Sequence, residues 1–295
     1  MNNPFFVKGI WLNNRVALPQ QGVGSVIADL LVEGGFRTVY YHVADGHQEF
    51  KVQTNWWPPI GYDPKYQPNI NPAIVTDLHL HGIKVIGWGM CYGTDPASDG
   101  KMAATLATKY GLDGWVFDVE QYLDLGQNAT TDVIKLITAF KGLSNLPLGY
   151  CSWPQFAGLH PVEVAKVAMQ LCDVGIPMAY HMNKELSQAV GSSMRIATAA
   201  MAEWRMFTNK PVVLAGRTFQ EKGYTTTPEA IAAFDRKARE LGAVGSAWWF
   251  LDHAQPGTKT GHPTWWKVLK ELPQYGEAIE EPRRCPTCNQ LWPVG

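Results

Sequence analysis

The stretch DGWVFDVEQYLD, residues 113–124, joins an apolar strand to a cluster of acids. Residues 115–117 (WVF) have the character of a buried β-strand, and Asp118 and Glu120 follow directly. Side chains two residues apart on a strand point to the same side, so we expect both carboxylates on one face, opposite Phe117. Two acids on one face at the end of a buried strand indicate a functional site at that end.

Apolar, strand-like runs alternate with helix-like runs on both sides of this stretch. Strands are predicted at residues 5–12, 37–44, 84–90, 114–120, 147–153, 173–180, 211–219 and 245–252. Amphipathic stretches at residues 23–35, 72–82, 132–143 and 228–242 predict helices, several of which end in Gly just before the next strand. The repeat of roughly 30–45 residues suits one strand–helix unit. Eight such units predict the α/β class and a single (β/α)8 TIM barrel over residues 1–272.

A doubly wound open sheet is the alternative to the barrel. Such a sheet usually carries a glycine-rich phosphate loop after its first strand, and residues 11–24 (WLNNRVALPQQGVG) do not form one. The barrel is therefore the favoured fold.

Composition excludes several classes of function. The chain has 295 residues, of which 46% are apolar and 17% charged, enough for a large core. Its net charge of −1 argues against nucleic acid or an anionic membrane as a partner. No apolar run approaches the roughly 18 residues of a membrane span, and the N-terminal sequence lacks the pattern of a signal peptide. We expect a protein that is cytoplasmic until released, or associated with a phage.

Two segments fall outside the repeat. Residues 45–72 are rich in Pro, Asn and aromatic residues, and would form either a cleft wall over the barrel face or a surface loop. Residues 273–295 predict an extended tail in which Cys285 and Cys288 form a C-x-x-C pair. A structural zinc ion there needs two further ligands, from a distant His or from a second chain, which would make the tail an oligomer contact. Two ordinary thiols are the alternative.

The acids at the end of residues 114–120 have a chemical use if they face the barrel mouth. Polar residues at the C-terminal ends of barrel strands form the sites of this fold. Two close carboxylates cannot both ionise easily, so one pKa rises, which suits a general acid near neutral pH. Cleavage of a glycosidic bond requires such an acid. The structural alternative is that Asp118 and Glu120 pair with Arg or Lys, or cap a helix.

The same stretch resembles a known signature. DGWVFDVE resembles the strand-four pattern D-G-x-D-x-D-x-E of glycoside hydrolase family 18, the chitinase-like barrels. Asp113, Gly114, Asp118 and Glu120 match the pattern, whereas Val116 stands where the family has its middle acid.

Two later strands extend the resemblance in the family's order. PMAYHM resembles the strand-six motif M-x-Y-D, with Met178 and Tyr180 matching and His181 in place of Asp. GSAWWFLD resembles the strand-eight motif G-x-x-x-W-x-x-D, and Gly245, Trp249 and Asp252 match it. The strand-three motif S-x-G-G has no counterpart in residues 84–93.

The resemblance implies a role for each matching side chain. Glu120 would protonate the leaving oxygen, and Asp118 would orient the 2-acetamido group of the substrate and stabilise its attack on the anomeric carbon. Tyr180 would hydrogen-bond that acetamido group, and Trp249 would form the floor under the sugar. This substrate-assisted route needs no protein nucleophile, and no cofactor is expected for catalysis.

A second family is also similar. FDVE and LPLGYCSW resemble strands four and five of glycoside hydrolase family 25, the lysozymes that cut peptidoglycan, although KGIWLNN lacks that family's strand-one Asp. In both families Glu120 would be the acid. In both, the partner would be an N-acetylhexosamine polymer, chitin-like or peptidoglycan.

Further residues at strand ends could line a substrate cleft, with barrel packing as the alternative for each. The full expected substrate-binding set is Trp249, Asp113, Met178, Tyr40, Trp88, Tyr150 and Asp252. No H-E-x-x-H, G-x-S-x-G or P-loop motif is present.

Two functions therefore stay open. The first is a glycosidase that cleaves an amino-sugar polysaccharide. The second is a hydrolase-like barrel that binds glycan or serves as a structural module, for example in a phage particle, without cutting. Val116, His181 and the missing strand-three motif favour the second function.

Overall fold

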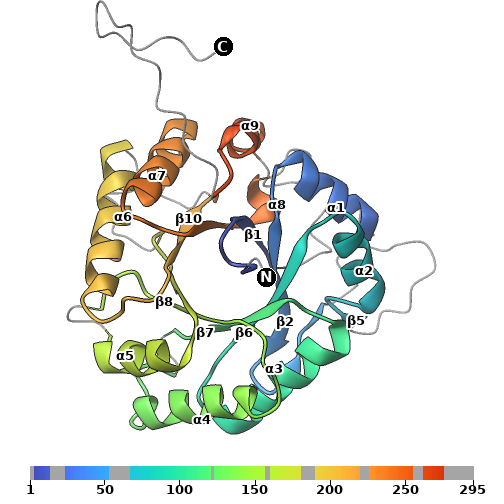
Figure 1. Ribbon diagram of the computed structural model, residues 1–295, viewed down its shortest axis with the longest axis vertical. Coiled ribbons are helices and arrows are strands. Elements are labelled where there is room, and N and C mark those ends of the chain that lie inside the picture. Colours follow the sequence, from blue (N-terminus) through green and yellow to red (C-terminus); the bar gives the residue numbers. More distant parts are fainter. Residues whose placement is uncertain are drawn as a thin grey trace, which may run out of the picture.

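The computed structural model is a (β/α)8 barrel (Figure 1). It describes residues 3–13, 24–52, 67–120, 123–156, 160–180, 190–219, 226–254 and 262–275. The parallel strands of the barrel follow one another in the order β10-β11-β1-β2-β6-β7-β8-β9. A parallel bridge between Gly175 and Val212 joins the two ends of this sheet.

The eight predicted strands are all present. The barrel strands are β1 (Lys8–Leu12), β2 (Thr38–Asp45), β6 (Lys84–Met90), β7 (Gly114–Asp118), β8 (Leu148–Ser152), β9 (Val174–Pro177), β10 (Val213–Arg217) and β11 (Gly245–Trp249). Five end one to three residues earlier than expected, namely β7, β8, β9, β10 and β11; β7 stops at Asp118 and β9 at Pro177. Glu120 and Tyr180 therefore lie on the segments that leave these strands.

The helices form an outer ring around the strands (Figure 1). They are α1 (Gly24–Glu33), α2 (Pro72–Leu80), α3 (Pro96–Tyr110), α4 (Ala129–Lys141), α5 (Val162–Leu171), α6 (Val190–Arg205), α7 (Pro228–Glu240), α8 (Leu251–Ala254) and α9 (Pro263–Glu271). None of those described is long and apolar enough to cross a membrane.

Local sequence signals explain where several helices begin. The side chains of Asn71, Asp95 and Thr227 accept hydrogen bonds from the backbone of the first turns of α2, α3 and α7. In each case a Pro follows at the start of the helix, where its missing N–H costs nothing. These caps fix the points at which the chain turns back over the sheet.

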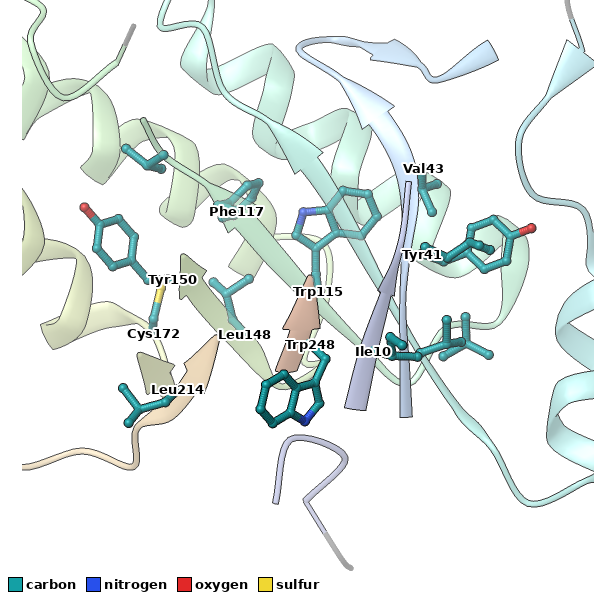
Figure 2. Packing of buried hydrophobic residues seen from close by; sticks show 14 of the residues in the cluster. Ile10, Tyr41, Val43, Trp115, Phe117, Leu148, Tyr150, Cys172, Leu214 and Trp248 are labelled. Atoms are coloured by element: carbon teal, nitrogen blue, oxygen red, sulfur yellow. The ribbon is translucent and has the colours of Figure 1, made fainter. Parts of the chain in front are cut away.

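Side-chain alternation along β7 divides the core into two layers. Trp115 and Phe117 belong to the outer layer between the sheet and the helices (Figure 2). They pack on Phe140 of α4, with ring centroids 6.3 Å and 5.7 Å away. Val116 belongs to the inner layer that fills the barrel. Asp118, two residues further on, is on the inner face as predicted.

A glycine on the neighbouring strand makes room for the outer layer. A Cβ atom on Gly87 of β6 would lie 2.6 Å from the ring of Trp115 and 2.6 Å from a methyl carbon of Leu112. The indole therefore lies directly over the backbone of β6, and its packing locks β7 beside β6.

The segment between β2 and α2 is only partly described. Its described residues include the short strands β3 (Gln48–Glu49), β4 (Lys51–Val52) and β5 (Gln67–Pro68). β3 folds back on β2 as an antiparallel partner, and Phe50 stacks on His42 at 3.6 Å between ring centroids. Whether residues 45–72 form a cleft wall stays a prediction, because residues 53–66 lie outside the described chain.

The C-terminal segment is tied to the N-terminal end of the barrel. The fully buried Lys8 of β1 donates hydrogen bonds from Nζ to the carbonyl oxygens of Leu269 (2.7 Å) and Leu272 (3.1 Å). Arg239 stacks on the ring of Tyr275 at 3.8 Å and donates a hydrogen bond to the carbonyl of Gln274. The first residues of the expected tail thus pack on the barrel, and residues 276–295 lie outside the described part.

Candidate active site

The C-terminal ends of the parallel strands meet at one face of the barrel, the barrel mouth. Asp118 is the last residue of β7 and Trp249 the last of β11. Glu120 follows β7 and Tyr180 follows β9 by a few residues. Burial and the charges of Asp118 and Glu120 both raise the pKa of Tyr180, so these carboxyls lie within electrostatic range of the phenol.

Asp118 is buried beside a thiol. The residue is 6% exposed and pairs in register with Cys151 of β8. Its Oδ1 atom has no hydrogen-bond partner in the described structure. Burial, reinforced by the charge of Glu120, raises the pKa of Asp118 well above its usual range. This carboxyl therefore tends to hold a proton at a pH at which an exposed Asp is ionised.

Glu120 is only half-buried, at the edge of the same face. Burial, with the charge of Asp124 as the next cause, raises its pKa above the usual range. Neither Glu120 nor Asp118 is paired with Arg or Lys in the described part of the chain. A raised pKa and partial exposure are the properties that a general acid needs.

Aromatic rings form the floor of the mouth. Trp249 meets the edges of Trp11 and Trp88, with ring centroids 5.6 Å and 5.7 Å away. Tyr180 lies nearly parallel to Trp249, at 6.2 Å and 18°. Both Trp249 and Tyr180 keep some exposure, and the peptide bond that follows Trp249 is cis. A partly exposed indole offers a flat apolar surface on which a sugar ring can stack.

Three expected substrate contacts lie beneath this floor. Met178, Tyr40 and Trp88 are 1%, 0% and 2% exposed and belong to the inner layer of the barrel. Tyr40 stacks on Trp11 at 4.7 Å, and Trp88 stacks on His42 at 3.8 Å. Their packing supports the floor from below, and the expectation that Tyr40 itself contacts a substrate is wrong because its side chain is fully covered.

Asp113 is at the wrong end of the barrel for a substrate contact. It precedes β7, and five residues of strand, about 16 Å, separate it from Asp118. Its carboxylate accepts hydrogen bonds from the backbone N–H of Val85 (2.8 Å), from Lys84 (2.9 Å) and from His79 (2.7 Å). Asp113 therefore fixes the N-terminal end of β6 to β7.

Tyr150 faces away from the mouth. Its ring is fully buried between the sheet and the helices (Figure 2). The ring centroid lies 5.9 Å from that of Trp204 in α6. The alternation on β8 points Cys151, not Tyr150, into the barrel. The expectation that Tyr150 lines the cleft is therefore wrong.

Four expected residues cannot be placed. Asp252 lies in α8, but its side chain is outside the described structure, as are His181, Cys285 and Cys288. The zinc site in the tail therefore stays a prediction. Among the side chains that are described, no three His, Cys, Asp or Glu come together as a metal site.

The structure adds a buried His–Asp pair that the sequence did not reveal. His160 Nδ1 lies 2.7 Å from Asp124 Oδ2, and their side chains are 9% and 2% exposed. The His160 ring stacks on Trp153, with centroids 4.5 Å apart and planes 17° apart. Asp124 lies within the opening stretch of acids, but its partner is 36 residues away and carries no motif.

Similar solved structures share this architecture. A glycoside hydrolase family 18 chitinase from Pseudoalteromonas aurantia has a TM-score of 0.61 at 15% identity, covering 90% of this chain and 98% of its own. The fold is that of a chitinase-like TIM barrel. An endo-1,4-β-D-mannanase from Thermotoga petrophila reaches a TM-score of 0.63 at 12% identity, with 90% and 98% of the two chains covered. A xylanase–α-amylase inhibitor protein reaches 0.52 at 14% identity, with 89% and 94% covered.

Comparison with protein-family models and with curated protein sequences gave no match. At such identities the structural likeness establishes the fold of this chitinase-like barrel and not its reaction, since one barrel fold carries many activities.

Proposed function

We propose that this barrel is a glycosidase that cleaves a polysaccharide containing N-acetylhexosamine, chitin-like or peptidoglycan, with Glu120 as the general acid. The observation that carries the proposal is the meeting of Asp118, Glu120, Tyr180 and Trp249 at the barrel mouth, with the pKa of both carboxyls raised. The structural neighbours include chitinases and a mannanase.

The proposed chemistry uses the substrate's own acetamido group. Its carbonyl oxygen attacks the anomeric carbon while Glu120 transfers its proton to the glycosidic oxygen, and the bond to the leaving sugar breaks. Asp118 orients the acetamido N–H, Tyr180 donates a hydrogen bond to its oxygen, and Trp249 supports the sugar ring. Water then opens the cyclic intermediate and Glu120 takes up the proton, which restores the acid.

A Glu120→Gln variant tests the proposal. Release of reducing ends from chitin oligomers and from purified cell walls should fall by about 10²–10⁴-fold, because glutamine keeps the shape but has no acidic proton. Glu163→Gln, on the exposed face of α5, is the matched control and should retain full activity. Equal release by wild type and Glu120→Gln on both substrates would overturn the proposal.

A second function, glycan binding without cleavage, is favoured by Val116. This side chain is completely buried in the inner layer at the position where the family 18 motif has an acid. Asp118 consequently has no carboxyl neighbour below it on β7, and it pairs in register with Cys151 of β8. The barrel of the xylanase–α-amylase inhibitor protein shows that the architecture also occurs in a protein named for inhibition. Binding of chitin oligomers measured by calorimetry, without any turnover, would support this second function.

A further inference from the structure

The charge of Asp124 acts on the proposed acid, Glu120. Asp124 lies four residues after Glu120, and its backbone N–H donates a hydrogen bond to the carbonyl oxygen of Glu120 at 3.2 Å. The residue is 2% exposed, and its Oδ1 atom has no hydrogen-bond partner in the described structure. A buried carboxylate with one unpartnered oxygen is costly, so its retention in this position calls for a reason.

His160 holds Asp124 in one orientation. Its Nδ1–H points at Oδ2 over 2.7 Å, while the flat stack on Trp153 fixes the imidazole plane. Trp153 directly follows β8, so the pair is anchored to a strand next to β7. Three consecutive links thus connect the rigid barrel to Glu120: Trp153 to His160, His160 to Asp124, and Asp124 to Glu120.

We propose that Asp124, held by His160, is a positioning residue that acts through Glu120 and sets the pH range over which Glu120 can donate its proton. The inference rests on the proposed function. It assigns to this pair the influence on the pKa of the catalytic carboxyls that an acid at position 116 could otherwise exert. Asp124 does not touch the substrate in this arrangement and acts only through its charge and its hydrogen bond to the backbone.

The direction of the effect follows from electrostatics. Negative charge on Asp124 disfavours a second negative charge on Glu120 and so raises the pKa of Glu120. Hydrogen bonding and the charge of His160 favour the ionised form of Asp124, against the burial that raises the pKa of Asp124. The charge of Asp124 therefore adds to burial, the larger cause, in keeping Glu120 protonated at a pH at which an isolated glutamate would have lost its proton.

Other titratable groups interact electrostatically with Glu120 and Asp124. Electrostatic interactions link Glu120 to Asp118 of β7, Cys151 of β8 and Tyr180 after β9, and link Asp124 to Tyr150 of β8. Lys166 and Glu203 line, together with His160, a groove between α5 and α6. Because the carboxyls are coupled, the titration of Glu120 has to be followed at its own carbon atom.

Asp124→Asn is the decisive variant, because asparagine can still accept the hydrogen bond from His160 but carries no charge. The ¹³C chemical shift of the Glu120 carboxyl, assigned by its absence in Glu120→Gln, gives the titration midpoint without any turnover. We expect this midpoint, and the basic limb of the kcat/KM profile, to move to lower pH by about one pH unit. His160→Leu should shift both in the same direction, because leucine has no donor and Asp124 then loses the hydrogen bond that favours its charge.

His79→Gln is the matched control. Its partner variant His79→Leu, which has no donor, breaks a His–Asp contact of the same length, 2.7 Å, at the opposite end of the barrel, and both should leave the titration of Glu120 unchanged. If Asp124→Asn leaves both the midpoint and the basic limb where they are in the wild type, the inference is wrong. Absence of hydrolysis by the wild type would instead refute the proposed function. The titration of the Glu120 carboxyl would still test whether Asp124 raises the pKa of Glu120.

Discussion

At the scale of single residues, burial of a carboxyl at the barrel mouth lowers the free energy of unfolding. Asp118 is buried with one oxygen unpartnered, and its pKa is raised by burial and by Glu120. A carboxyl with a raised pKa in the folded state stabilises the protein below its unfolded pKa of about 3.9, and this contribution is lost as the pH rises through the folded pKa. The site therefore costs stability at neutral and alkaline pH, as is common for functional sites.

Asp118→Asn should consequently stabilise the protein in a pH-dependent way. We expect its melting temperature to exceed that of the wild type by about 2–4 °C at pH 8, corresponding to about 1 kcal/mol, and the gain to shrink towards pH 4. Thermal unfolding monitored by circular dichroism at both pH values measures this. Asp132→Asn, at a surface ion pair on α4, serves as control and should show no such gain. A pH-independent change in Asp118→Asn would contradict the assignment.

At the scale of the elements, the register of neighbouring strands depends on large rings lying over small residues. Trp115 of β7 covers Gly87 of β6, and the same arrangement recurs where Trp248 of β11 lies 2.5 Å from a Cβ built on Gly216 of β10. The rings fill the layer between sheet and helices, and the glycines let them approach the backbone. This packing holds the end of β7, and with it Asp118, at a fixed height in the mouth.

Gly87→Ala should therefore destabilise the barrel by about 1–3 kcal/mol, the usual cost of overpacking, because its methyl group would overlap the indole of Trp115. Gly191→Ala is the matched control, since a Cβ at that position of α6 meets no atom within 4 Å. Alanine favours a helix over glycine, so this control should be neutral or slightly stabilising. Urea unfolding compares the two variants, and equal effects would count against the packing argument.

At the scale of the whole molecule, the first strand and the last helix are joined by buried polar contacts. Lys8 donates to two carbonyls at the C-terminal end of α9, where the helix dipole also favours a cation. The contact spans more than 260 residues of sequence, and it closes the barrel at the end opposite the acids. The site and the stabilising contacts of the termini are thus at different ends of the fold, as is usual for TIM barrels.

Lys8→Met should uncouple the C-terminal segment. The substitution leaves two buried carbonyls without a donor, at a cost of about 1–3 kcal/mol each when no water replaces it. We expect a lower urea midpoint together with faster hydrogen exchange in α9. Lys270→Met, which removes only an exposed ion pair with Glu33, is the control and should change stability by less than about 1 kcal/mol. If both variants change stability equally, the contact between Lys8 and the end of α9 does not stabilise the barrel.

The sequence alone determined the eight strands, the barrel and the acids at the end of β7. Apolar runs, glycine stops and the two-residue period are local properties, and they survive folding because each strand of a parallel barrel is buried on both sides. The same local rule set Asp118 on the inner face.

Only the tertiary structure decided which of the other candidates reach the mouth. Asp113 matched a motif but sits at the N-terminal end of its strand, and Tyr150 lies on the outer face of β8. The Asp124–His160 pair joins two loops 36 residues apart, and no local pattern signals it. Height along a strand and contacts between loops arise from how the strands stagger and pack, and a period in the sequence carries no information about either.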